Sequence, residues 1–175
     1  MYASNEVHSC IQKAVELLGL GNQHLRKIAV RGDYTVDLQA LEAAMVADRA
    51  AGCRPICVVG NAGTVNTGAI DDLQALVNLC VREGLWFHVD GAIGVVAVLA
   101  PSVKPRLAGI EKADSVALDL HKWMHLPFEV GCVLVRHAEA HRQTFSLTPE
   151  YLEHESRGIA AGHTWFSDYG LQLSR

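Results

Sequence analysis

The residue of this sequence with the clearest chemical potential is a lysine between two apolar runs. Lys122 follows His121 and stands between residues 115–118 and 131–135, both of which read as short buried strands. We expect burial between these strands to disfavour the charged ammonium group and so to lower its pKa. An amine that loses its proton near neutral pH is a nucleophile towards carbonyl groups. A solvated lysine in a surface loop is the alternative that this stretch leaves open.

Polar residues also follow two other apolar runs that we expect to be strands. They are Asn61 and Thr64 after residues 56–59, and Asp90 after residues 85–89. In an open parallel sheet, ligands bind beyond the carboxyl ends of the strands. A lysine and an aspartate brought together there could form only a structural ion pair. They also suit pyridoxal phosphate, whose aldehyde bonds to a lysine and whose ring nitrogen is kept protonated by an acid.

The order of the elements predicts an α/β fold. Nearly all-apolar strands alternating with amphipathic helices indicate a mostly parallel sheet with helices on both faces. The expected strands are residues 25–30, 56–59, 85–89, 115–118 and 131–135. The gap before the last of them contains Pro127 and is too short for a crossover helix, so we expect that strand to be antiparallel to its neighbour.

The helices that we expect are marked by capping residues and glycine stops. They run over residues 4–18 with Ser4 as the cap, from Asp37 to Gly52, from Asp71 or Asp72 to Gly84, and over a short stretch within 91–100. Residues 143–170 have no clear periodicity and predict a long loop.

Composition narrows the class of protein. Of the 175 residues, 50% are hydrophobic and 19% are charged, as is usual for a soluble globular chain. The net charge of −4 is too small to indicate nucleic acid or an acidic membrane surface as a partner. We see neither a run of about 20 apolar residues nor a secretory signal, and therefore expect no membrane span. Five scattered cysteines without a Cys-x-x-Cys pair predict reduced thiols in a cytoplasmic protein.

Two further patterns predict no site. His137 and His141, like His121 and His125, have the spacing of metal ligands on a helix, but neither pair belongs to a His-Glu-x-x-His motif. We expect no metal site and interpret the first pair as a solvated helix face. The glycine-rich turn over residues 60–68 lacks the Gly-Lys-Ser/Thr ending of a nucleotide-binding phosphate loop.

Four segments together make this sequence similar to a known family. They are SNEVHSCIQKAVELLGLG, GNAGTVNTGAIDDL, WFHVDGAIG and DLHKWMHLPFEVGCVLVR, and a weaker match runs through TPEYLEHESRG to GLQLSR. In this order they resemble the group II pyridoxal-phosphate-dependent amino acid decarboxylases, of the aromatic amino acid and glutamate decarboxylase type. The resemblance implies the large domain of a fold-type I enzyme, a pyridoxal 5′-phosphate cofactor, and conversion of an L-amino acid to an amine and carbon dioxide.

The resemblance also implies roles for the residues that would hold the cofactor. Lys122 would be the Schiff-base lysine, and His121 would contact the cofactor's phosphate or imine. Asp90 would pair with the pyridinium nitrogen. Thr64 would form a hydrogen bond near the cofactor's 3′-oxygen or with the carboxylate of Asp90.

Three further positions match the family's motifs. His8 would stack on one face of the ring and help to orient the substrate, and Ala92 would pack on the opposite face. Tyr151 matches the tyrosine of the family's mobile catalytic loop, which is thought to protonate the carbanion after carbon dioxide leaves. This sequence departs from the family at Ile93, where a further aromatic residue is common.

The resemblance implies a partial chain. We expect residues 1–142 to be the central part of the cofactor-binding large domain. Residues 143–175 would hold the catalytic-loop region and the start of a C-terminal segment. The family's phosphate-binding loop would lie upstream, and the full-length enzyme would be a homodimer. Its partner would be a small-molecule amino acid substrate, with a weak preference for aromatic amino acids.

Two groups of alternatives stay open. Within the same cofactor class, the protein could be an aldehyde synthase or an aminotransferase. From a different class, the chain could be a non-catalytic fragment that folds or dimerises without binding the cofactor.

Overall fold

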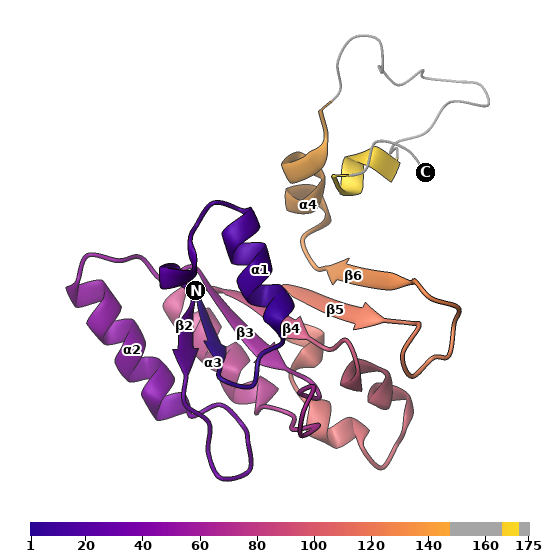
Figure 1. The fold of residues 1–175 in the computed structure, drawn as a ribbon, viewed down its shortest axis with the longest axis horizontal. Coiled ribbons are helices and arrows are strands. Elements are labelled where there is room, and N and C mark those ends of the chain that lie inside the picture. The colour runs from indigo at the N-terminus through magenta and orange to yellow at the C-terminus, as the bar shows by residue number, and fades with distance from the viewer. Residues whose placement is uncertain (148–165, 172–175) are drawn as a thin grey trace. The chain divides into compact units, whose positions relative to one another are not determined.

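The computed structural model describes residues 1–147 and 166–171, and the chain forms two units, Met1–Leu134 and Val135–Arg175. The first unit holds almost all of a six-stranded sheet with the order β2-β1-β3-β4-β5-β6 (Figure 1). The strands are β1 (Tyr2–Ser4), β2 (Arg26–Ile28), β3 (Cys57–Asn61), β4 (Trp86–Asp90), β5 (Ser115–Asp119) and β6 (Gly131–Val135).

The sheet is mostly parallel, as predicted. Strands β1 to β5 pair in parallel throughout. Strand β6 runs in the opposite direction to β5 in Figure 1, as the short connection between them requires. The carboxyl ends of β3, β4 and β5 therefore meet at one edge of the sheet.

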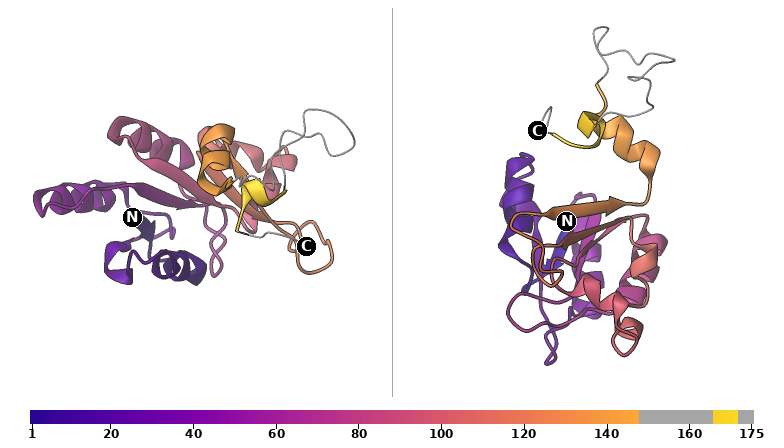
Figure 2. Two further views of the ribbon diagram at one scale, coloured as in Figure 1. Left: turned by 90° about the horizontal axis from the view of Figure 1, so that it is seen from above. Right: turned by 90° about the vertical axis from the view of Figure 1, so that its right-hand side faces the viewer.

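Helices cover both faces of the sheet, which confirms the predicted α/β class (Figure 2). Helix α1 (Ser9–Leu17) packs through Val15 against Ala3, Cys57 and Val59. Helices α2 (Leu38–Ala50) and α3 (Leu73–Glu83) pack on the opposite face, over a larger apolar core. The 3-10 turns of this unit are η1 (Asn22–His24), η2 (Gly94–Leu99), η3 (Lys104–Leu107) and η4 (Ile110–Lys112).

The second unit contains helix α4 (Ala138–Phe145) and the 3-10 turn η6 (Phe166–Tyr169). His141 joins the two, because its Nε2 lies 3.0 Å from the carbonyl oxygen of Tyr169. The His141 side chain therefore forms a contact within the chain. Most of the loop predicted over residues 143–170 lies outside the described residues.

Helices α2 and α3 have aspartate N-caps, as the sequence predicted. Asp37 accepts hydrogen bonds from the backbone N–H groups of Gln39 and Ala40 at the start of α2. Asp72, rather than Asp71, caps α3. Gly84 ends α3 in the left-handed conformation, with φ of 65°.

A helix lies within the predicted residues 4–18, but its start and its cap were predicted wrongly. Ser4 is the last residue of strand β1 and does not cap a helix, and α1 begins five residues later, with His8 as its cap. Strand β1 has only three residues, all of them buried, so no alternation in the sequence could reveal it. The apolar stretch from 91 to 100 was also expected to contain a short helix, and it holds the 3-10 turn η2.

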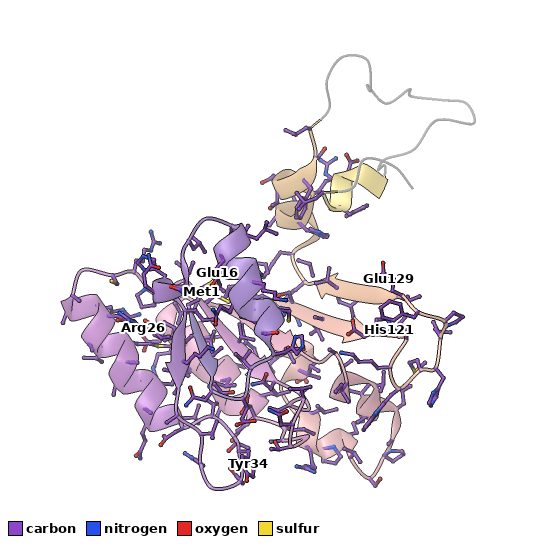
Figure 3. The ribbon with its side chains drawn as sticks, in the orientation of Figure 1. Met1, Glu16, Arg26, Tyr34, His121 and Glu129 are labelled. Carbon is purple, nitrogen blue, oxygen red and sulfur yellow. The ribbon has the colours of Figure 1, made fainter. Side chains whose placement is uncertain are left out.

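A buried carboxylate ties the long β2–α2 loop, whose tip carries Tyr34 (Figure 3), to the end of β3. Asp71 accepts hydrogen bonds from the backbone N–H groups of Val36 and Asn61, each at 2.7 Å, and from the side-chain amide of Asn61. Burial raises the pKa of Asp71, although these donors favour its charged form. The network fixes Asn61 at the strand end.

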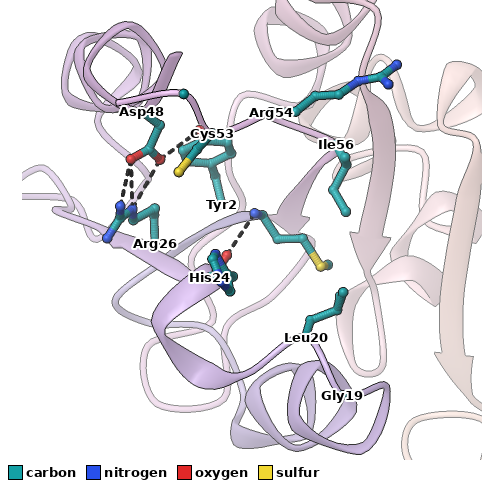
Figure 4. A pocket seen from close by; sticks show the side chains of 11 residues that line it. Tyr2, Gly19, Leu20, His24, Arg26, Asp48, Cys53, Arg54 and Ile56 are labelled. Carbon is teal, nitrogen blue, oxygen red and sulfur yellow. Dashed lines mark hydrogen bonds and ion pairs between the residues drawn. The ribbon is translucent and has the colours of Figure 1, made fainter. Parts of the chain in front are cut away.

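A second carboxylate joins α2 to the edge of the sheet (Figure 4). Asp48 accepts a hydrogen bond from the hydroxyl of Tyr2 at 2.9 Å and forms an ion pair with Arg26 at 2.7 Å. These side chains line a cavity of about 480 Å³ that is separate from the strand ends. The Arg26 guanidinium lowers the pKa of Asp48, while burial raises the pKa of Tyr2 to about 12.

We expect Asp48 to make folding sensitive to acid. Because its pKa is lower in the folded chain than the ordinary 3.8, its stabilisation is complete above that value and is lost as the pH falls through the folded pKa. Arg26 is 47% exposed, so we expect a loss of only about 1 kcal/mol. Urea unfolding at about pH 6 and about pH 3 should show this extra loss in the wild type relative to Asp48→Asn.

Glu42→Gln is the matched control, because the partner of Glu42, Arg82, is even more exposed. An equal loss of stability on acidification in the wild type and in Asp48→Asn would contradict the role given to Asp48.

Candidate active site at the strand ends

A cavity of about 480 Å³ opens at the carboxyl ends of β3, β4 and β5, beside the start of α1. Five of the predicted site residues line it: His8, Thr64, Asp90, Ala92 and Lys122. These residues come from four separate segments of the first unit: the start of α1 and the ends of β3, β4 and β5. The predicted amine and the predicted carboxylate thus open into the same cavity.

Strand β4 directs Asp90 into this cavity through its alternation. Phe87 and Val89 are 1% and 0% exposed and belong to the core on the α3 side, so Trp86, His88 and Asp90 face the other way. One carboxylate oxygen of Asp90 accepts a hydrogen bond from the backbone N–H of Ala92 at 3.3 Å. A carboxylate at this position can pair with a cationic ligand group.

Lys122 lies in the turn that follows β5, and the burial expected for it is not observed. Its side chain is 38% exposed, and its ammonium group forms an ion pair with Asp119 at 2.7 Å. Lys122 follows β5, which lies next to the edge strand of the sheet. Asp119 holds the amine at the mouth of the cavity.

His121, the neighbour of Lys122, is fixed by the same turn but does not line the cavity. Its Nδ1 accepts a hydrogen bond from the backbone N–H of Val130 at 2.9 Å. The Phe128 ring packs edge-on against it, with ring centroids 4.8 Å apart. Figure 3 labels His121 in this connection between β5 and β6.

His8 is held at the cavity by its role as the N-cap of α1. Its Nδ1 accepts a hydrogen bond from the backbone N–H of Cys10 at 3.2 Å, so a neutral ring carries its proton on Nε2. The side chain is exposed. A flat imidazole is therefore available to a ligand in the cavity.

Thr64 lines the cavity from the turn after β3. Its hydroxyl lies 2.7 Å from that of Thr67 and accepts a hydrogen bond from the backbone N–H of Ala69. These bonds lie within its own turn, and the described structure has no hydrogen bond from Thr64 to Asp90. Tyr151 lies outside the described residues.

The structure adds three polar residues that the sequence reading left without a role: Cys10, His88 and Asp119. The signal for His88 was present, since strand alternation places it on the same face as Asp90. Burial lowers the pKa of His88 and therefore favours the neutral ring. Burial also raises the pKa of Cys10, and the neighbouring Asp90 adds to this effect.

The chain belongs to the pyridoxal-dependent decarboxylase family, because residues 1–175 match the conserved domain of that family. It is 37% identical to the aromatic-L-amino-acid decarboxylase of Bacillus atrophaeus over 175 residues, which cover 100% of this chain and 36% of that protein. This confirms the resemblance found in the motifs.

Solved structures agree with this assignment. The crystal structure of mouse CSAD matches with a TM-score of 0.90 and 29% identity, over 99% of this chain and 36% of that one. Oryza sativa TDC, solved with PLP and tryptamine, matches with a TM-score of 0.84 and 32% identity, over 89% of this chain and 32% of that one. The chain thus spans about a third of the length of these relatives.

The described part of the chain holds neither a metal site nor a membrane-spanning helix. Within residues 1–147 and 166–171, no group of three or more His, Cys, Asp or Glu side chains is placed to hold a metal ion. No described helix has the length and apolar character needed to cross a membrane.

The cavity depends on a close approach between the segments that follow β3 and β4. The backbone N–H of Gly94 donates to the carbonyl oxygen of Ala62 at 2.9 Å. A methyl group on Gly94 would collide with that oxygen and lie 2.8 Å from the Ala62 carbonyl carbon. Only glycine allows this packing.

We expect Gly94→Ala to lower the free energy of unfolding by about 1–3 kcal/mol, because backbone atoms on both segments must move apart. Urea denaturation measures the change. Gly32→Ala is the control, since a methyl group there meets no atom within 4 Å. Equal stabilities for the two variants would show that the contact does not constrain the cavity.

Proposed function

We propose that the whole protein containing this chain is a pyridoxal-phosphate-dependent decarboxylase that converts an L-amino acid to an amine and carbon dioxide. The observation that carries the proposal is that Lys122 and Asp90 line the same cavity. His8 and Ala92 line it as well. Membership of the pyridoxal-dependent decarboxylase family supports it.

The residues fit the cofactor by their chemistry. Lys122 would bond the aldehyde carbon through Nζ, with Asp119 holding the amine at the cavity mouth. Asp90 would accept a hydrogen bond from the protonated ring nitrogen, and that charge pair keeps both groups ionised. When bound, pyridoxal phosphate supplies a ring that accepts the electron pair left behind by carbon dioxide.

The remaining predicted residues would position the reacting groups. His8 would stack on one face of the ring from its place at the start of α1, and Ala92 would leave room for the ring on the other. Thr64 would hold the edge of the cofactor ring near its 3′-oxygen. His121 would contact the cofactor on its phosphate side. Tyr151 would donate the proton that completes the product amine.

An aromatic L-amino acid is the substrate class that we propose. The apolar side chains of Ile11, Val65 and Ile93 line the cavity, and Lys122 is its one lysine or arginine among the described residues. A substrate with a second carboxylate would therefore lack a cationic partner on this wall. The 37% identical relative is named an aromatic-L-amino-acid decarboxylase.

We also propose that the full-length protein is a cytoplasmic homodimer. All five cysteines are free, as is usual in a reducing compartment. Large exposed apolar side chains gather in the β5–β6 connection, namely Trp123, Met124, Leu126 and Phe128. Exposed apolar groups of this size are typical of protein–protein contacts.

The full-length protein, incubated with pyridoxal phosphate and aromatic L-amino acids, should release carbon dioxide and the matching amine in equal amounts. We expect Lys122→Ala to lower this rate by about 100-fold or more, because a covalent step is lost. Lys112→Ala is the control, since Lys112 lies on the surface and bonds Gln74. Carbon dioxide release that survives in Lys122→Ala would contradict the assignment.

The products also separate decarboxylation from the alternatives in the same cofactor class. An aldehyde in place of the amine would indicate an aldehyde synthase, and a keto acid would indicate an aminotransferase. We expect Tyr151→Phe to lower the yield of amine. An unchanged amine yield would exclude Tyr151 as the proton donor.

A further inference from the structure

Trp86, Ser115 and His88 form a chain of hydrogen bonds on β4 and β5, close to Asp90. None of the three belongs to the predicted site. The indole N–H of Trp86 donates to the hydroxyl oxygen of Ser115 at 2.9 Å, and Nδ1 of His88 lies 2.8 Å from the same oxygen. Ser115 stands on β5, in register with His88 on β4. The three residues therefore bind two strands together beside the cavity.

The donors and acceptors in this chain determine which nitrogen of His88 carries its proton. An indole N–H can only donate, so Ser115 must accept from Trp86. Ser115 is 7% exposed, and within the described residues its hydroxyl hydrogen has no acceptor other than Nδ1 of His88. If Nδ1 carried the proton, that buried hydroxyl hydrogen would be left without a partner, which is costly. A neutral His88 is thus the Nε2–H tautomer.

The Nε2–H of His88 faces the cavity. Nδ1 is engaged by Ser115, and His88 lines the same cavity as Asp90, so Nε2 is the ring nitrogen available on the cavity side. No hydrogen bond of Nε2 to the protein is present in the described part of the chain. Alternate residues on one face of a strand are neighbours, so the Nε2–H of His88 can reach the Asp90 carboxylate directly or through one bridging water.

We propose that Trp86 and Ser115 fix His88 as an Nε2–H donor, and that His88 is thereby a positioning residue for the carboxylate of Asp90. This inference rests on the proposed function, because Asp90 is the group that would face the cationic ring nitrogen. The Ala92 N–H at 3.3 Å is a long hydrogen bond and by itself holds the carboxylate weakly. A neutral donor orients Asp90 without cancelling its negative charge, which a charged imidazolium would do.

The tautomer is measured first, in the full-length protein without cofactor, by long-range ¹H–¹⁵N correlation spectra of the His88 ring. We expect a protonated Nε2 and an unprotonated Nδ1. Ser115→Ala should give a mixture of tautomers, whereas Ser115→Thr, which keeps the hydroxyl, should retain the wild-type pattern. A wild-type ring that is protonated on Nδ1 would overturn the proposal.

Cofactor affinity is measured second, by titrating the full-length variants with pyridoxal phosphate and following protein fluorescence. We expect His88→Leu to bind about tenfold more weakly, the effect of losing one hydrogen bond to a charged group. His88→Gln places an amide N–H near the position of Nε2 and should restore most of this affinity.

Wild-type affinity in His88→Leu would overturn the positioning role while leaving the proposed function intact. Failure of the wild type to bind pyridoxal phosphate would overturn both. The tautomer of His88 is measured on the wild-type protein. It therefore tests the assigned proton position even if a variant fails to fold.

Discussion

Only every second side chain of strand β4 can pack in the apolar core. This alternation places the polar side chains of β4 on the side of the cavity. Phe87 and Val89 fill the apolar layer on the α3 side, which leaves Trp86, His88 and Asp90 no position other than the α1 side. A slip of one residue in the pairing of β4 would move the imidazole and the carboxylate into that apolar layer. The register of this strand is therefore set by the same burial that presents Asp90 to the cavity.

The parallel pairing extends this arrangement to the neighbouring strands. Asn61, Asp90 and Ala117 stand in one row across β3, β4 and β5. The segments that follow these strands then supply Thr64, Ala92 and Lys122 to one cavity. Its two main charged groups, the Asp90 carboxylate and the Lys122 ammonium, come from different strand ends. The Asp119 carboxylate beside Lys122 holds the amine at the cavity.

Much of this architecture could be predicted from the sequence, because burial and capping are local signals. The apolar runs gave β3 to β6, and Asp37 and Gly84 marked helix ends where the structure has them. Strand β1 was missed because three residues carry no periodicity, and its neighbours in the sheet come from elsewhere in the chain. The exposure of Lys122 was missed for a related reason: what covers a turn is a matter of packing, which its flanking residues do not encode.

The central claim is that the amine of Lys122 and the carboxylate of Asp90 serve one bound pyridoxal phosphate. Reducing the full-length protein with borohydride in the presence of the cofactor fixes the pyridoxyl group to the lysine that holds it, and peptide mass spectrometry then locates that lysine. The account predicts labelling of Lys122, with much weaker labelling in Asp90→Ala. Labelling of another lysine, or labelling of Lys122 that is indifferent to Asp90, would contradict it.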